Sequence, residues 1–167
     1  MNKYAFVDRD GTIIWEPEKP KGVDPRETFP LTNANQVSFI EGAIKGLHTL
    51  SAKGYKLVLV TNQTFLGTPK HPQDIFDQVM EKIVSELGEN GVRFEFVMVC
   101  PHGPDEGCTC RKPRTGGVET FLRENPVDLQ HSLMFGDRDT DGEFAKNLGV
   151  RFVRVKTNVK FLVPDDI

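Results

Sequence analysis

The sequence predicts an α/β fold, a Rossmann-like parallel sheet with helices on both of its faces. Short apolar runs of the kind found in buried strands alternate along the chain with longer segments of helical periodicity. Several of the predicted strands end in polar residues, which a parallel sheet would gather at one edge. No internal repeat, low-complexity tract or linker divides the chain. We therefore expect residues 1–167 to form a single domain.

The composition is that of an ordinary soluble protein, with 38% hydrophobic and 27% charged residues. The net charge of -3 argues against binding to nucleic-acid backbones. No apolar run approaches the roughly 20 residues that a membrane span needs, and the N-terminus shows no signal peptide. Three cysteines, an odd number, fit a reducing compartment better than a disulfide framework. We therefore expect a cytoplasmic protein that binds neither nucleic acid nor membrane.

The strands are predicted from runs of apolar and β-branched residues, and the helices from apolar residues three and four positions apart. Gly54 ends the first helix and Pro72 begins the second. In chain order, we expect a strand at 4–7, a helix at about 40–53, a strand at 56–60, a helix from 72 to about 90, a strand at 94–99, a helix from 118 to just before Pro126, a strand at 132–135, a helix at about 139–148 and a strand at 150–155.

Two long loops interrupt this alternation. Residues 15–36 contain four prolines and no periodicity, so we expect an irregular loop that leaves the first strand and covers whatever its end binds. The second loop follows the third strand, is rich in glycine and cysteine, and runs to Pro113. The last dozen residues show no clear pattern, and we expect a short tail.

Polar side chains stand where the predicted strands end. Asp8 and Asp10 follow the first strand, Thr61 and Asn62 end the second, and Asp137 follows the fourth. Two carboxylates at the end of a buried strand repel each other and are costly to desolvate, which a metal ion or a reacting group can compensate. The alternative is a polar turn in which Asp8 caps the next segment. Lys112, just before the third helix, would add a cation at the same edge.

These residue types fit the chemistry of a phosphate ester. Asp8 would attack phosphorus and form an aspartyl-phosphate, and Asp10 would protonate the leaving alcohol and then deprotonate the hydrolytic water. Asp8 and Asp137 would hold Mg²⁺, which prefers carboxylate and phosphate oxygens. The remaining phosphoryl oxygens would be bound by Thr61, Asn62 and Lys112.

All three cysteines lie in the second loop, where Cys100, His102, Cys108 and Cys110 form a complete tetrahedral set for Zn²⁺. The alternatives are free thiols beside a surface histidine, or a redox pair of Cys108 and Cys110. A site with four protein ligands is closed, so zinc would shape the loop rather than react. The loop ends in Arg111-Lys112, so this structural zinc would position both cations.

The sequence resembles the HAD superfamily of phosphohydrolases in four motifs, in order along the chain: Asp8-Arg9-Asp10-Gly11-Thr12, Thr61-Asn62, Lys112, and the segment Gly136-Asp137-Arg138-Asp139-Thr140-Asp141. The resemblance implies the roles given above and adds the main-chain carbonyl of Asp10 as a Mg²⁺ ligand. Asp141, one helical turn after Asp137, would support Lys112 or the metal, or would serve only as an acidic residue at a helix N-terminus.

Within the superfamily, the cysteine loop is similar to that of phosphatases acting on histidinol phosphate and on heptose bisphosphate. The short spacer between His102 and Cys108 and the Thr61–Thr68 stretch favour the histidinol-phosphate type. The resemblance therefore implies a histidinol-phosphate phosphatase of histidine biosynthesis, with heptose 1,7-bisphosphate phosphatase as the alternative. It also implies an association with an imidazoleglycerol-phosphate dehydratase domain or chain, and it predicts a glycine where Phe65 stands.

The leaving group of histidinol phosphate carries an ammonium and an imidazole. Glu16 on the covering loop is our candidate to bind the ammonium, and its alternative is an ordinary solvated loop acid. Arg111 is a second candidate for substrate binding. Two further classes are considered, a nucleic-acid 3′-phosphatase and a non-catalytic zinc-stabilised scaffold. The lack of a Lys/Arg stripe argues against the first, and the presence of Asp8, Asp10, Lys112 and Asp137 together argues against the second.

Overall fold

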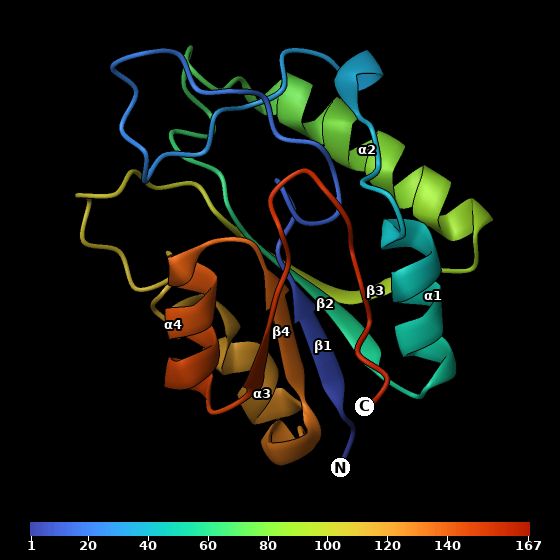
Figure 1. Ribbon diagram of the computed structural model, residues 1–167. Coiled ribbons are helices and arrows are strands. Elements are labelled where there is room, and N and C mark those ends of the chain that lie inside the picture. The colour runs from blue at the N-terminus through green and yellow to red at the C-terminus, as the bar shows by residue number, and fades with distance from the viewer.

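The computed structural model describes residues 1–167 and contains a five-stranded, fully parallel sheet. The strands are β1 (Tyr4–Val7), β2 (Lys56–Asn62), β3 (Phe94–Cys100), β4 (Leu133–Gly136) and β5 (Arg151–Arg154). The α-helices are α1 (Ala43–Ala52), α2 (Gln73–Glu89), α3 (Glu119–Glu124) and α4 (Asp139–Leu148). The strand order is β3-β2-β1-β4-β5 (Figure 1). The predicted Rossmann-like α/β class is confirmed.

Helices cover both faces of the sheet. Strand β1 lies in the middle of the sheet, and its side chains are buried on both faces. Ala5 and Val7 pack into the core cluster that includes side chains of α1 and α2. Tyr4 and Phe6 point the other way, into the cluster that includes side chains of α3 and α4. Because a central parallel strand is buried on both faces, it carries a continuous apolar run rather than an alternating one. Figure 1 shows the two helix pairs on opposite sides of the sheet.

The element ends differ from the predicted ones by a few residues, for local reasons. Helix α1 begins at Ala43 rather than near residue 40, because Gly42 has a φ of 81° and a left-handed residue cannot lie inside an α-helix. Helix α3 is only six residues long and follows a 3₁₀ turn, Gly116–Val118. None of the helices is both long enough and apolar enough to cross a membrane.

The C-terminal residues form a turn that packs on the domain, where the sequence led us to expect a tail without pattern. The chain leaves β5, turns at Thr157 and Asn158, and returns to the core at Phe161, which is 2% exposed. The Phe161 ring stacks on Phe135, with centroids 5.0 Å apart. In Figure 1 this segment rises to the loop end of the sheet and comes back. We refer to residues 155–161 as the C-terminal hairpin.

Phe161→Ala should lower the free energy of unfolding by about 3–5 kcal/mol, because a large buried ring would leave a cavity beside Phe135. The matched control is Leu162→Ala, since Leu162 is 61% exposed and should change stability by less than about 0.5 kcal/mol. Urea denaturation followed by circular dichroism measures both. Equal effects of the two substitutions would show that the hairpin is not anchored by Phe161.

Candidate active site

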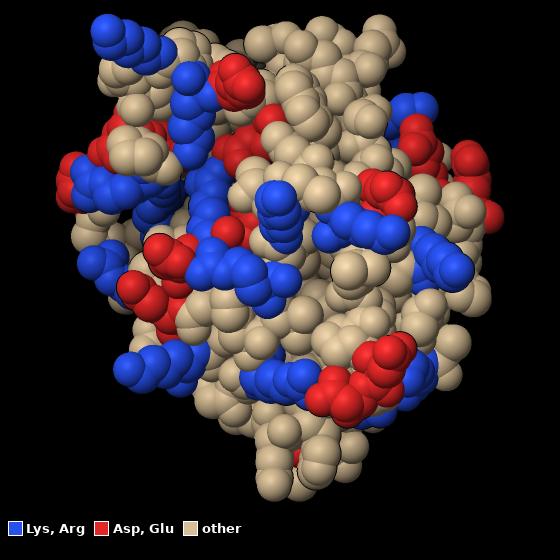
Figure 2. Space-filling model, viewed as in Figure 1, with Lys and Arg blue, Asp and Glu red and all other residues tan.

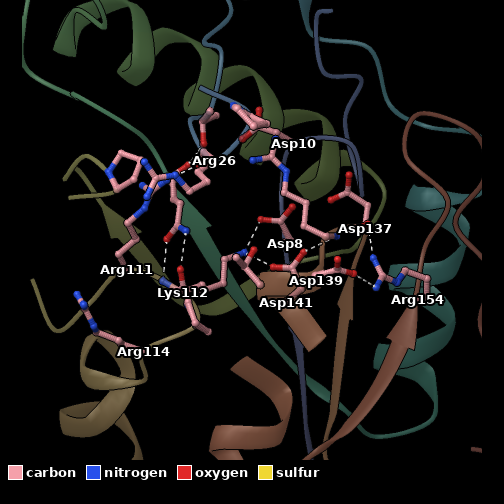
Figure 3. A pocket seen from close by; sticks show the side chains of 17 residues that line it. Asp8, Asp10, Arg26, Arg111, Lys112, Arg114, Asp137, Asp139, Asp141 and Arg154 are labelled. Carbon is pink, nitrogen blue, oxygen red and sulfur yellow. Dashed lines mark hydrogen bonds and ion pairs between the residues drawn. The ribbon is translucent and has the colours of Figure 1, made fainter. Parts of the chain in front are cut away.

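The polar residues predicted at the strand ends lie together at one edge of the sheet. Asp8 follows β1, Asn62 ends β2 and Asp137 follows β4, and all three line a cavity of about 630 Å³. Apart from Pro25, Pro104 and Pro113, every residue that lines this cavity is polar or charged. Figure 2 shows Lys and Arg side chains gathered around Asp and Glu on this side of the molecule, and Figure 3 shows the lining side chains from close by.

A buried ion cluster forms the floor of the cavity. The Lys112 ammonium donates to Asp8 Oδ1 at 2.6 Å and to Asp141 Oδ1 at 2.7 Å. Burial raises the pKa of Asp8 well above its ordinary value, although Lys112 opposes this shift. Burial alone would lower the pKa of Lys112, but the carboxylates of Asp141 and Asp8 outweigh burial and raise it. Lys112 is therefore a protonated cation at neutral pH, held against the predicted nucleophile.

Asp141 holds Lys112 and also caps its own helix. Its second carboxylate oxygen accepts a hydrogen bond from the Arg138 amide at 3.0 Å, at the start of α4. Of the roles considered for Asp141, support of Lys112 and the helix N-terminal acid are both observed. A Cβ added at Gly136 would lie 2.4 Å from the Asp141 side chain. Glycine is therefore needed at position 136 so that the Asp141 side chain can pack against the backbone there.

The acidic group fits a hard divalent cation. Carboxylate oxygens of Asp8, Asp137 and Asp141 lie within 4.8 Å of one another. The Thr12 hydroxyl lies between Asp8 Oδ2, at 3.4 Å, and Asp137 Oδ1, at 3.3 Å. Burial raises the pKa of Asp137, so ionising these neighbouring acids together requires a compensating positive charge. Oxygen ligands of this kind suit Mg²⁺, and the donor set is compatible with it.

Asp10 points away from Asp8, toward Arg9 and Gln63. Arg9 is fully buried and donates to both oxygens of Asp10, at 2.9 and 3.0 Å, and Gln63 donates to Asp10 Oδ2 at 2.7 Å. Burial would raise the pKa of Asp10, but Arg9, Gln63 and Arg138 together outweigh burial and the pKa is lowered. Asp10 is thus ionised at neutral pH, the state that a general base requires.

Thr61 and Asn62 are neighbours at the end of β2, but only Asn62 lines the cavity. Thr61 is fully buried beneath the cavity, and its hydroxyl accepts a hydrogen bond from Gln63 at 2.7 Å. Asn62 lines the cavity, but its amide is used on the Lys112 backbone, accepting from the Lys112 amide at 3.0 Å and donating to its carbonyl at 3.2 Å. Asn62 therefore fixes the backbone from which the lysine extends.

The cysteine loop brings its four predicted ligands together. Cys100 Sγ lies 3.2 Å from Cys110 Sγ and 3.7 Å from Cys108 Sγ, and His102 Nδ1 lies 3.5 and 3.3 Å from the sulfurs of Cys100 and Cys110. These separations are too long for a disulfide bond, and all three cysteines are free. Tetrahedral zinc with ligands at 2.3 Å separates its sulfurs by about 3.8 Å. The four side chains fit Zn²⁺ in kind and in spacing.

The two long loops are tied together over the cavity. Arg111 donates to the His102 carbonyl at 2.8 Å and to the Arg26 carbonyl at 2.6 Å. Arg26 in turn forms a bidentate ion pair with Asp105, in which Nη1 and Nη2 donate to Oδ1 and Oδ2 at 3.0 and 3.1 Å. The covering loop is thus fastened to the cysteine loop, and Arg111 lines the cavity while bridging the two.

Glu16 is buried and forms an ion pair with Arg138. It does not line the cavity itself, whereas Arg138 does. Burial raises the pKa of Glu16, and Arg138 opposes that shift. Glu16 is therefore not an ordinary solvated loop acid.

Phe65, where a glycine was expected, has a φ of 57°. This left-handed backbone explains the expectation, because glycine adopts it without steric cost. The ring does not line the cavity and lies against Gly103, where an added Cβ would be 2.7 Å from it. Phe65 thus braces the cysteine loop from outside the cavity.

Several side chains at the site were missed by sequence reasoning. Arg9 and Arg138 lie inside the motifs that resemble the HAD superfamily. The sequence therefore indicated that they are near the site, but not which residues they contact. Gln63 directly follows the Thr61-Asn62 pair, so its position could have predicted that it lies at the site. Thr157 and Asn158 come from the C-terminal hairpin, and nothing in the local sequence marks them. Thr157 donates to Asp137 Oδ2 at 2.8 Å.

A parallel sheet whose central strand ends in Asp-x-Asp, facing a lysine and a further aspartate, defines the HAD-like class of hydrolases. A HAD-hydrolase-like family model matches residues 109–161, which include Lys112, Asp137 and Asp141. This match covers less than half of the chain, which is similar to the class in its fold and in the residues at the strand ends.

The similar curated proteins include histidine-biosynthesis proteins. The chain is 37% identical over 155 residues to the histidine biosynthesis bifunctional protein HisB of Legionella pneumophila, covering 93% of this chain and 42% of that protein. It is 38% identical over 152 residues to HisB of Campylobacter jejuni, covering 91% and 41%. The chain therefore spans less than half the length of these relatives.

Among solved structures, the D,D-heptose 1,7-bisphosphate phosphatase of B. bronchiseptica, complexed with magnesium and phosphate, superimposes with a TM-score of 0.78 at 26% identity. The match covers 93% of this chain and 82% of that one. A second structure, of a HAD-like phosphatase from Mesorhizobium loti, has a TM-score of 0.74 at 25% identity, covering 89% and 69%.

Cys108→Ser should remove bound zinc, because one of four ligands is lost and the loop has few apolar contacts to replace it. We expect about one zinc per chain in the wild type and a clearly lower zinc content in the variant. Plasma mass spectrometry of protein purified without added zinc measures this, with the surface substitution Thr120→Ser as control. Wild-type protein free of zinc would contradict the assignment.

Proposed function

We propose that the chain is a Mg²⁺-dependent phosphatase that hydrolyses L-histidinol phosphate to L-histidinol and phosphate. The cluster of Asp8, Lys112 and Asp137 supports phosphoryl transfer. For the substrate, the observation that carries the proposal is the 37–38% identity to histidine-biosynthesis proteins over more than nine-tenths of the chain.

Asp8 is the nucleophile. Its two oxygens have different surroundings, since Oδ1 binds Lys112 and Oδ2 faces Thr12 and Asp137. The Asp8 carboxylate attacks phosphorus, the ester P–O bond breaks, and an aspartyl-phosphate forms. Lys112 favours the ionised form of Asp8 against the effect of burial. It would also neutralise charge on the phosphoryl oxygens, an electrostatic contribution from a fixed and buried cation.

Asp10 carries the proton. In the first step it gives a proton to the leaving alkoxide, and in the second it takes one from the water that attacks the aspartyl-phosphate. The lowered pKa described above suits the second step. The first step requires Asp10 to acquire a proton, so its side chain must leave Arg9 and Gln63 and turn toward the cavity.

Two metal sites follow from the donor sets. Asp8, Asp137 and the Asp10 carbonyl would hold Mg²⁺, which offsets the repulsion between the carboxylate and the phosphate when bound. Cys100, His102, Cys108 and Cys110 would hold structural Zn²⁺. Zinc then acts on the reaction only through the position of Lys112, because a site with four protein ligands has no open position.

Five arginines line the cavity, and three of them pair with carboxylates: Arg26 with Asp105, Arg138 with Glu16 and Arg154 with Asp139. Arg111 and Arg114 donate to carbonyls and keep their charge. Five aspartates also line the cavity, and their carboxylates would accommodate a cationic leaving group. Glu16 does not line the cavity, so to bind the substrate ammonium its carboxylate would have to turn toward the cavity from its ion pair with Arg138. Arg111 would contact the substrate from the cavity wall while bridging the two loops.

The setting of this activity is also a proposal. Residues 1–167 would work as one phosphatase domain in the cytoplasm, where a reducing environment keeps the three thiols available for zinc. Because the relatives are bifunctional proteins more than twice as long as this chain, we propose an association with a dehydratase domain or chain.

The second candidate is heptose 1,7-bisphosphate hydrolysis, favoured by the TM-score of 0.78 to a phosphatase of that type. The nucleophile, the metal sites and the lysine would be the same. The two candidates differ in the leaving group, which is cationic in one case and carries a second phosphate in the other.

Phosphate release should be fastest with histidinol phosphate, at about 10²-fold higher kcat/KM than with heptose 1,7-bisphosphate or p-nitrophenyl phosphate, because a site that pairs with a substrate's polar groups rejects esters lacking them. A colorimetric phosphate assay with added Mg²⁺ measures all three. A preference for heptose bisphosphate by the same factor would replace the substrate assignment with the second candidate.

Asp8→Asn serves as the variant control for these assays. It should lower kcat by about 10⁴-fold or more with every ester, because the nucleophile is lost, while circular dichroism shows a folded chain. Unchanged phosphate release would remove Asp8 as the nucleophile.

A further inference from the structure

We infer that Thr157 and Asn158 are positioning residues that fix the carboxylate of the magnesium ligand Asp137 and the backbone around the Asp-x-Asp turn. We call this pair the clasp. The inference rests on the proposed function, since it concerns the metal ligand and the loop of that site.

Thr157 sets the rotation of the Asp137 carboxylate. Its hydroxyl donates to Asp137 Oδ2 at 2.8 Å, so Oδ1 is the oxygen that faces Thr12 and, beyond it, Asp8. The terminal torsion of an aspartate is soft, and this hydrogen bond holds it with one oxygen toward the predicted magnesium position. Outer-shell partners of this kind typically change metal affinity 10- to 100-fold.

Asn158 joins the two sides of the motif turn. Its backbone amide donates to the Gly11 carbonyl at 3.1 Å. Its side-chain amide accepts from the Glu16 amide and donates to the Glu16 carbonyl, both at 2.8 Å. Asn158 has a φ of 57°, a conformation that asparagine tolerates better than most residues. One residue thus ties Gly11, beside the aspartates, to the start of the covering loop.

The hairpin that carries the clasp is anchored independently of these side chains. The Val155 amide donates to the Gly136 carbonyl at 2.8 Å, and the Phe161 amide donates to the Glu41 carbonyl at 2.9 Å. Phe161 itself is buried in the core. Removing the Thr157 hydroxyl should therefore leave the hairpin in place and change only the contact with Asp137. The hairpin is a device for bringing polar atoms to the site from the end of the chain.

The test for Thr157 is Mg²⁺ binding by isothermal titration calorimetry on zinc-loaded protein, using MgCl₂ alone. Thr157→Val, which keeps the shape of the side chain, should raise the Mg²⁺ dissociation constant about tenfold. It should leave the KM for the ester at saturating Mg²⁺ and the thermal midpoint unchanged. Thr157→Ser should restore wild-type affinity, and the surface control Thr120→Val should retain it. A Thr157→Val protein with wild-type Mg²⁺ affinity overturns the role of Thr157.

The test for Asn158 uses Asn158→Gly, which accepts the positive φ and removes only the side chain. Hydrogen exchange at the Glu16 amide should become at least about tenfold faster, with the Mg²⁺ dissociation constant unchanged, because the lost contacts are to the loop. Unchanged exchange at Glu16 overturns the role of Asn158.

These results are separable from the proposed function. If the wild type binds Mg²⁺ in a Thr157-dependent way but releases phosphate from none of the esters, the function fails and the role of the clasp stands. If the wild type releases phosphate and Thr157→Val binds Mg²⁺ normally, the function stands and the role of Thr157 fails.

Discussion

The buried ammonium of Lys112, held between Asp8 and Asp141, is the interaction on which the rest of the site depends. Removing charges from water costs several kcal/mol for each ion, and only close opposite charges with good geometry offset that cost. The three charged side chains come from three separate segments of the chain. Lys112 comes from the end of the cysteine loop, Asp8 follows β1, and Asp141 lies at the N-terminus of α4. Asn62 then fixes the lysine backbone from β2.

The sheet topology explains why these groups meet. The chain builds β1, β2 and β3 toward one edge and then returns to add β4 and β5 on the other side of β1. The order therefore reverses between β1 and β4, and ligands in such sheets bind at that reversal, outside the carboxyl ends of the strands. Asp8 and Asp137 follow these two neighbouring strands. Their closeness creates the repulsion that a magnesium ion would relieve.

Much of this arrangement could be predicted from the sequence, because it depends on local patterns. Buried parallel strands must be apolar throughout, so β1 and β2 stood out as runs, and the polar residues after them marked the site edge. The grouping of Cys100, His102, Cys108 and Cys110 was predictable because they lie within eleven residues of each other. The start of α1 was predicted too early, since helical spacing continues through Ile40 whereas the backbone turns at Gly42.

What could not be predicted depends on contacts between distant residues. The partner of Glu16 is Arg138, 122 positions away, and that pairing follows from how the loops fold over the sheet. Thr157 and Asn158 lie on a hairpin without apolar periodicity. The burial of Phe161 and the backbone hydrogen bonds of Val155 and Phe161 place them at the site. The side chain of Asp10 faces Arg9, its neighbour in sequence, and this orientation is held by a further hydrogen bond from the buried Gln63, 53 positions away.

A crystal structure of the protein with Mg²⁺ and beryllium trifluoride, a mimic of the phosphoryl group, tests the central claim most directly. The account predicts beryllium bonded to a carboxylate oxygen of Asp8, magnesium ligated by Asp8 and Asp137, and the Lys112 ammonium within hydrogen-bonding distance of a fluorine. Beryllium bonded to Asp10, or a Lys112 side chain that has left the site, would contradict it.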